Sequence, residues 1–382
     1  MRKSEWSDTV LDPLREVGDP LVDDVLSAEM RKGSMRQVSQ LLKTIVRNDD
    51  PISAELPPAI QAYFNDTAQL PPFADPQKLA TAQQIYQLYN IEIGLMLMYA
   101  ALPATYAAKK GVQVLMLTER MAKPKHVHQR LSETGRFVFD VMGPNGFEPQ
   151  GRAIRSAQKV RLVHGMVRHH IVHADNHADI WDNEWGTPIN QEDMAGTMLA
   201  FSVHVLDGLA CIGIMLTPDE KEAFIHLWSV VGHFLGIGSA LIPNDRADAE
   251  ALAKVITERH FAPSPEGQHL TLTILDMLES SMPRPLKNHP HAMMRYCLGN
   301  SVADMIGVNP ADWTSELIWL RFGVVGYFEQ MRYANHWSKR MAASHSRRAV
   351  GLAGYSFLTG LNHLQQVQLN PFSLPFRLGY SA

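Results

Sequence analysis

The sequence predicts an all-α protein, with one large helical domain over residues 1–382. Through most of the chain, apolar residues recur at spacings of three and four, which is the pattern of a helix face turned toward a core. Several of these segments begin with residues that favour helix starts. No run of useful length alternates between polar and apolar residues, so strand content is expected to be near nil.

Start and stop signals place the helices of the first half. Asp19 and Pro20 form a cap and first turn, Ser34 is a second cap, and Asp75 and Pro76 open a third segment. Proline-rich stretches separate the early helices, and glycines at residues 143 and 146 end a later one. The helices expected here cover residues 20–32, 35–46, 59–65, 76–87, 91–101, 103–122, 126–142 and 152–173.

The second half carries stronger start signals. Asn190 precedes two acids in a first turn, and Thr217 precedes Pro218 with Glu220 three residues on, which is the pattern of a capping box. Residues 176–190 are expected to form a loop. The expected helices cover residues 191–215, 218–236, 244–260, 266–281, 289–306, 310–341 and 350–367.

Composition excludes several classes of function. The formal net charge is −4, and no basic patch indicates binding to nucleic acid. The two cysteines, Cys211 and Cys297, lie in apolar helical segments and are expected to be buried thiols without a catalytic role. The N-terminus has no apolar signal region, and the most apolar stretch, 91–102, is too short to span a bilayer. We therefore expect a cytoplasmic protein without a transmembrane segment.

The helix over residues 152–173 is the first candidate for chemistry. Arg161, His164 and Arg168 lie at i, i+3 and i+7 beside an apolar stripe. Such groups are costly to bury unless an anion or a metal meets them. A neutral imidazole facing an apolar cavity is typical of a proximal haem ligand, and arginines one turn away can pair with haem propionates. The alternative is an interior histidine among surface arginines. The stripe consists of Val160, Val163, Val167 and Ile171.

Two further groups allow different interpretations. His169, His173 and His177 lie at i, i+4 and i+8 and could form a metal face, although a polar helix end explains them as well. Arg130 and Thr134 share a helix face that could orient dioxygen or a carbonyl, or could be a solvated helix start. No HExxH zinc motif is present.

The last group lies between residues 226 and 238. His226, Trp228 and His233 lie on a half-polar helix, where either histidine could support a site or fill the core. The glycines at 232, 236 and 238 permit close approach of a helix or a flat ligand, which is weak evidence for a site.

Together, these motifs resemble the latex-clearing protein (rubber oxygenase) and MpaB-like oxygenase family. The resemblance covers about residues 90–310 and rests on the combined run of motifs. These are Arg161-x-x-His164-x-x-x-Arg168-His169, WGTPINQEDMAGTMLAFS, AFIHLWSVVGHFLGI with Leu241-Ile242-Pro243, and MPRPLKN followed by RYCLGNSVADMIGV. The resemblance implies an all-helical fold with a globin-like core around haem b and extra helices at both ends. It also implies cleavage of isoprenoid double bonds with dioxygen.

Carried onto this chain, the resemblance makes His164 the proximal ligand of the haem iron. It places Arg161, Arg168 and His169 at the positions that flank this ligand and bind the cofactor. It gives His226 a supporting role at the haem.

On the distal side, the resemblance assigns Arg130 and Thr134 to polarising dioxygen. The family's rubber oxygenases have a lysine where this chain has Glu133, and their proposed catalytic glutamate corresponds to Val114. Glu133, or the nearby Glu119, is then the candidate proton shuttle. These departures, with the missing secretion signal, favour a small apolar molecule over polyisoprene as substrate.

The sequence therefore predicts a haem b-dependent oxygenase that acts on a small apolar, possibly isoprenoid-like substrate with dioxygen. One alternative is a haem or ligand carrier without catalysis. The other is a non-haem metal enzyme that uses His169, His173 and His177.

Overall fold

The computed structural model describes residues 6–32, 40–42, 44–118, 124–174, 177–280, 282–310 and 318, with the side chains of 124–130 and 177 left out. This part of the chain is all-α, as predicted, with one isolated bridge between Ala108 and Phe261 and no strand. The elements up to residue 185 are α1 (Asp8–Arg15), α2 (Pro20–Arg31), α4 (Pro58–Asp66), α5 (Pro76–Met96), η1 (Leu97–Ala101), α6 (Leu102–Tyr106), α7 (Gln113–Leu117), α8 (Pro124–Met142), α9 (Ala153–Val172), α10 (His177–Ile180) and η2 (Asn183–Trp185).

The described second half continues with helices and short turns. Turns η1 and η3 are π-helical, whereas η2, η4 and η5 are 3-10 turns. The elements are α11 (Gln191–Leu199), η3 (Ala200–His204), α12 (Val205–Cys211), α13 (Pro218–Phe234), η4 (Ser239–Leu241), α14 (Arg246–His260), α15 (Pro265–Ser280), η5 (Arg284–Leu286) and α16 (His289–Met305).

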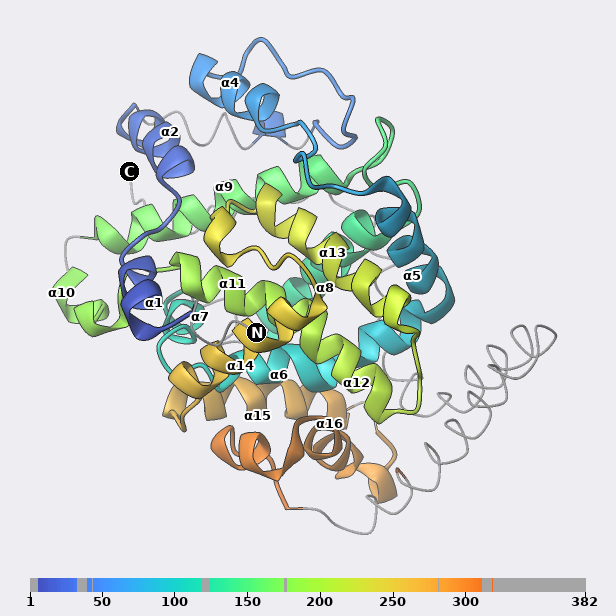
Figure 1. Ribbon diagram of the computed structural model, residues 1–382. Helices are drawn as coiled ribbons and strands as arrows, with labels where there is room; N and C mark the ends of the chain where they lie inside the picture. Colours follow the sequence, from blue (N-terminus) through green and yellow to red (C-terminus); the bar gives the residue numbers. More distant parts are fainter. Residues whose placement is uncertain are drawn as a thin grey trace.

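Helix α9 lies between two groups of helices (Figure 1). The N-terminal helices α2 and α4 lie on one side of it, and α8 and α13 pack against the other. On the first side, the Tyr63 hydroxyl of α4 donates a hydrogen bond of 2.8 Å to the Gln158 carbonyl of α9. Helices α15 and α16 pack together at the far end of the molecule. The helix predicted to carry the site is therefore held from both sides.

Gly165 allows α2 to approach α9 closely. A Cβ atom at this position would lie 2.4 Å from Cγ1 of Val22 and 2.7 Å from Cδ1 of Leu26. Both distances are far below van der Waals contact, so the absence of a side chain is what admits α2. The single glycine inside the predicted central helix thus has a packing role.

The main apolar core forms where α5 lies along α13, with α8 and α12 packed against α5 and α11 packed against α13. A second, smaller core fills the space between α2, α4 and α9. Fully buried aromatic side chains contribute large apolar areas to these cores, and such area is the main source of folding stability. They include Tyr89, Tyr99, Tyr106, Phe64, Phe224 and Phe234.

Three predicted helix starts are confirmed. The Glu220 N–H donates to Thr217 Oγ1 at 3.1 Å, and the Thr217 N–H donates to Glu220 Oε2 at 2.8 Å, which completes a capping box. Asn190 accepts from the Asp193 N–H at 2.9 Å, and Asp75 caps α5 in the same way.

The prediction for Asp19 was right about position and wrong about role. Asp19 is the residue before α2, but its side chain makes no capping hydrogen bond. Its carboxylate is instead paired with Arg161 of α9, and the Asp19 N–H donates to Asp23 Oδ2 at 3.0 Å. The buried guanidinium competes successfully for this carboxylate, because a charge-assisted bond away from water is stronger than an ordinary cap.

Two other predictions need correction. The helix expected over 103–122 is broken, since α6 ends at Tyr106 and α7 covers only Gln113–Leu117. Between them, the Ala107 carbonyl accepts from the Ala262 N–H at 2.9 Å, and the Lys109 N–H donates to the His260 carbonyl at 3.1 Å. These long-range bonds replace the helical ones.

The expected loop over 176–190 contains the short elements α10 and η2.

The helix expected over 191–215 ends at Cys211 and contains the π-helical turn η3. Within that turn, the buried Ser202 hydroxyl donates to the Met198 carbonyl at 3.0 Å.

Among the described residues, Gln191–Cys211 is the helix that meets the length and apolarity needed to cross a bilayer. Most of its apolar stretch is covered by the rest of the fold, as a core helix would be.

Some predictions fall outside the described residues. These are the cap at Ser34, the helices over 310–341 and 350–367, and Glu119. The single domain over 1–382 and the globin-like core remain predictions.

We expect Gly165→Ala to destabilise the protein by about 1–2 kcal/mol, because overpacking against Val22 and Leu26 outweighs the better helix propensity of alanine. Gly135→Ala in α8 is the matched control, since its new Cβ would meet nothing within 4 Å. That variant should gain up to about 1 kcal/mol. Urea unfolding of both variants measures the difference, and equal effects of the two substitutions would contradict the packing role of Gly165.

Candidate functional site

A cavity of about 330 Å³ lies among α6, α7, α8, α9, α11, η3 and α14. This volume is within the range of small-molecule pockets in proteins. Aliphatic and aromatic side chains form most of the wall, and threonines, histidines and two acids interrupt it. The cavity can therefore hold a largely apolar ligand.

Helix α9 presents His164 to this cavity. Val160, Val163 and Val167 of the predicted stripe line the wall around it. The His164 side chain lines the cavity, and its Nδ1 atom is fully buried. The sequence-based expectation of an imidazole beside an apolar stripe is confirmed in this geometry.

Helix α8, which packs on α9, supplies the other predicted residues. Glu133 and Thr134 line the cavity, together with Phe137 one turn further along. Arg130 belongs to α8, but its side chain lies outside the described part. The structure therefore brings His164, Thr134 and Glu133 to one cavity, where Val114 also contributes to the wall.

The two arginines that flank His164 do not line the cavity. Arg161 donates through Nη2 to Asp19 Oδ1 at 2.7 Å. Arg168 donates through Nε to Asp23 at 2.9 Å and through Nη1 to the Ile189 carbonyl at 2.8 Å. The anionic partners that we expected for these buried arginines are thus carboxylates of the protein itself, at the start of α2. The assignment of both arginines to cofactor binding remains a prediction.

Burial affects these ion pairs. It raises the pKa of the Asp23 carboxyl, and the nearby Arg168 guanidinium offsets only part of that effect. Burial alone would lower the pKa of Arg161, but the hydrogen bond and charge of Asp19 raise it overall. The Arg161–Asp19 pair is therefore a charged contact largely shielded from water, which is costly to break on one side, whereas Asp23 is partly exposed.

His169 and His226 also lie away from the cavity wall. The ring of His169 stacks on that of His173, with centroids 4.0 Å apart, and burial lowers the pKa of His169. His226 accepts a hydrogen bond of 2.9 Å from the Asp75 N–H, so it anchors the loop before α5. The role of both residues in cofactor binding remains a prediction.

The structure gives no support to the predicted histidine metal face within the part that it describes. There, no group of three or more His, Cys, Asp or Glu side chains converges as a metal site would require. His177 lies on α10, and its side chain is outside the described part.

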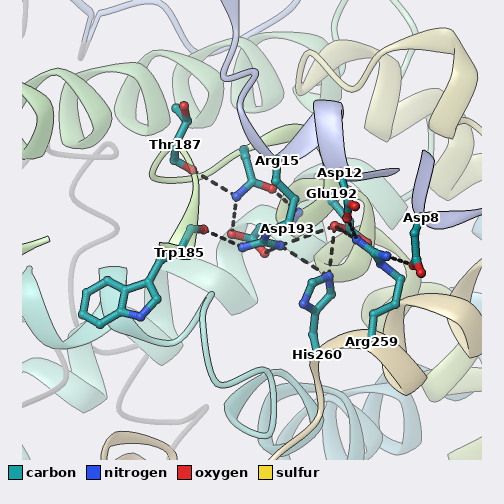
Figure 2. A network of polar contacts seen from close by, with 10 residues as sticks. Asp8, Asp12, Arg15, Trp185, Thr187, Glu192, Asp193, Arg259 and His260 are labelled. Carbon is teal, nitrogen blue, oxygen red and sulfur yellow. Dashed lines mark hydrogen bonds and ion pairs between the residues drawn. The ribbon is translucent and has the colours of Figure 1, made fainter. Parts of the chain in front are cut away.

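The sequence analysis missed a buried polar network beside the cavity (Figure 2). Arg15 of α1 reaches Asp193 Oδ1 at 3.0 Å and donates to the Trp185 carbonyl at 2.7 Å. His260 Nε2 lies 2.9 Å from Glu192 Oε2. Of these side chains, Asp193 and His260 line the cavity.

Each acid in this network has a different environment. Burial raises the pKa of Asp193, although Arg15 lowers it in part. Burial would also raise the pKa of Glu192, but hydrogen bonds from His260 and Arg259 lower it overall. Arg259 links the network to α1 through Asp12, at 2.7 Å. The network therefore ties α1, α11 and α14 together at one end of the cavity.

A periodic signal could have revealed part of this wall. Asp193, Thr197 and His204 recur at helical spacing on α11 and η3, and all three line the cavity. The sequence analysis treated the first of them only as part of a helix start. Arg15 carries no comparable signal, since its partners lie 170 or more residues away.

Known proteins resemble this chain over much of its length. The model of the family described as ER-bound oxygenase mpaB/B'/Rubber oxygenase, catalytic domain, matches residues 93–326. The chain belongs to this oxygenase family. A rubber oxygenase from Streptomyces sp. (strain K30) is 29% identical over 308 residues, which cover 76% of this chain and 71% of the relative.

A solved structure shares the fold. The structure of latex clearing protein LCP in the closed state superposes with a TM-score of 0.74 at 24% identity, over 86% of this chain and 90% of that one. The family range includes His164 and Thr134. It begins after Arg15, Asp19 and Asp23, so the buried partners of α9 and α11 come from outside that range.

We expect Asp19→Ala to destabilise the protein by about 3 kcal/mol or more, because it leaves the buried Arg161 guanidinium without its anion. Asp24→Ala is the control, since Asp24 is an exposed acid on the same helix and should change stability by less than about 0.5 kcal/mol. Chemical unfolding monitors both. A tolerated Asp19→Ala substitution would contradict the structural role of this pair.

Proposed function

We propose that this protein is a haem b-dependent oxygenase that acts on a small apolar, isoprenoid-like substrate with dioxygen. The observation that carries the proposal is the position of His164, whose imidazole faces an apolar cavity that Thr134 also lines. Membership of the oxygenase family supports the reaction class. The cofactor and the substrate are the proposed parts.

The residues around the cavity fit a haem. Imidazole is a standard axial ligand of haem iron, and the imidazole of His164 lines the cavity. The adjoining valines of α9 offer apolar contact to a flat, largely apolar macrocycle. His164 would hold the iron, and α8 would lie beside the cofactor.

When bound, a haem would supply the redox chemistry with dioxygen. The protein's own contribution is position and environment. Thr134 offers a hydroxyl that can donate to an oxygen atom in the cavity. Glu133, on the same wall, is placed to accept or donate a proton there. The apolar wall excludes water and keeps these polar contacts strong.

The cavity wall favours a substrate with little polarity. Relatives carry the names rubber oxygenase and latex clearing protein, and rubber is an unsaturated hydrocarbon polymer. For this chain we propose a smaller molecule with an isoprenoid-like double bond. Oxidative cleavage would break that double bond and form two carbonyl groups, with one atom of dioxygen on each.

A carrier without catalysis would share the haem and the cavity. The two functions differ in the fate of the alkene, since a carrier releases it unchanged. Oxygen uptake coupled to loss of an alkene therefore separates them.

We expect the purified protein from haem-replete cells to contain haem b, and His164→Ala to lose most of it because the iron has no axial imidazole. A pyridine haemochrome assay measures the content. His173→Ala is the control, since this exposed histidine lies on the same helix and away from the cavity. Full haem retention by His164→Ala would refute the ligand assignment, and equal haem loss in His173→Ala would show that the effect is not specific to His164.

We expect Thr134→Val to lower alkene turnover about tenfold or more with haem content unchanged, because the variant keeps its shape and loses a hydroxyl donor. Oxygen consumption and product formation measure the effect. Thr273→Val, on an exposed face of α15, is the control and should leave turnover as it is. Equal turnover by both variants would remove Thr134 from the mechanism.

A further inference from the structure

The cavity wall carries titratable side chains other than His164. They are Glu133, Asp193, His204 and His260. A ligand in an apolar cavity is oriented by the few polar groups that are still able to bond to it. The question is therefore which of these four groups is already engaged by the protein.

Asp193 and His260 are engaged. Asp193 accepts from Arg15 at 3.0 Å and from the Asn190 side chain at 2.8 Å. His260 Nε2 contacts Glu192 at 2.9 Å. Glu133 also has an interaction with the protein. This end of the cavity is thus a structural network whose polar groups are largely satisfied.

His204 differs from the other three. Among the described residues, no charged group and no hydrogen bond acts on its ring, and its nearest aromatic neighbour is Phe261, with centroids 6.5 Å apart. Burial lowers the pKa of His204, which favours the neutral imidazole. The side chain keeps some exposed surface, and it lines the cavity. A neutral imidazole with no protein partner is costly unless a ligand or water bonds to it.

The backbone at this position is also unusual. His204 is the last residue of the π-helical turn η3, which packs against the second π-helical turn, η1. Such turns are rare and often mark functional sites. Phe201, three residues earlier, also lines the cavity, and its ring is tilted against that of Trp228 with centroids 5.1 Å apart. The aromatic neighbours of His204 on this wall are therefore apolar.

We propose that His204 binds an uncharged oxygen atom, a hydroxyl or a carbonyl, on an otherwise apolar substrate. A neutral imidazole offers one donor and one acceptor, and a hydroxyl group can satisfy both. An anionic group is disfavoured, because a neutral ring gives no charge to balance it and Asp193 lies on the same wall. This inference rests on the proposed function, since it describes the substrate of that same cavity. His204 is then a specificity-determining residue that acts through binding.

The test measures binding by equilibrium dialysis, without dioxygen, on the full chain as purified. The probes are geraniol, the hydrocarbon myrcene with the same number of carbon atoms, and geranate. His204→Leu should weaken geraniol binding about tenfold, as loss of one buried hydrogen bond does, and should leave myrcene binding equal or tighter. The ratio of geraniol binding to myrcene binding is compared between variants, because this comparison cancels the difference in hydration between the two probes. His204→Gln, which keeps a donor and an acceptor, should retain geraniol binding within about threefold.

Thr197→Val is the matched control. Thr197 lines the same wall, but its hydroxyl already donates to the Asp193 carbonyl at 2.9 Å, so the ratio of geraniol to myrcene binding should stay the same. The inference would be overturned if His204→Leu lost equal affinity for geraniol and myrcene. It would also be overturned if the substitution weakened binding of geranate more than that of the other two probes. If His204→Leu does not fold, a loss of geraniol preference in His204→Gln would also overturn it. The assay is independent of turnover, so missing alkene oxidation would refute the reaction and leave this subsite standing.

Discussion

The pairing of two acids before and within α2 with two arginines of α9 is the interaction on which the site depends. Asp19 holds Arg161 and Asp23 holds Arg168, and these arginines lie one turn on either side of His164. The pairs fix the rotation of α9 about its axis, because each guanidinium can reach its carboxylate from one face of the helix only. That rotation turns Val160, Val163 and His164 to the cavity. The geometry at the imidazole is therefore set in part by two acids that lie outside α9, before and within α2.

The same arrangement explains how an apolar cavity can exist among so many charges. Arg15, Arg161, Arg168 and Arg259 all lie close to its walls, yet no guanidinium in the described part of the chain lines it. Each is bonded to carboxylates that come from other helices. Since the charges are balanced behind the wall, a ligand in the cavity would meet mainly hydrocarbon and a smaller number of polar groups. Selectivity then depends on those few groups.

Local patterns in the sequence predict the helices and part of the site. The capping box at Thr217, the cap at Asn190 and the stripe beside His164 all rest on contacts within a few residues, and the structure confirms them. The same reasoning fails where distant segments compete. The break after Tyr106 depends on bonds to residues 260–262, and Asp19 leaves its capping role for an arginine 142 residues away. His204 was not predicted, because Asp193, from which its helical spacing is counted, was interpreted only as part of a helix start.

The π-helical turn at residues 200–204 has a consequence for how this wall can change. In a turn of this kind each hydrogen bond spans one residue more than in an α-helix, and the Ser202 hydroxyl bonds to the carbonyl of Met198. The wide turn thereby takes up one extra residue, so deleting one residue within it would restore α-helical winding and leave the faces of α12 nearly in place. The same deletion in the α-helical residues of α11 would instead rotate α12 by about 100° and turn away the face that packs on α5 and α16. Changes of length are therefore tolerated at the π-helical turn and are disruptive in the helices on either side of it.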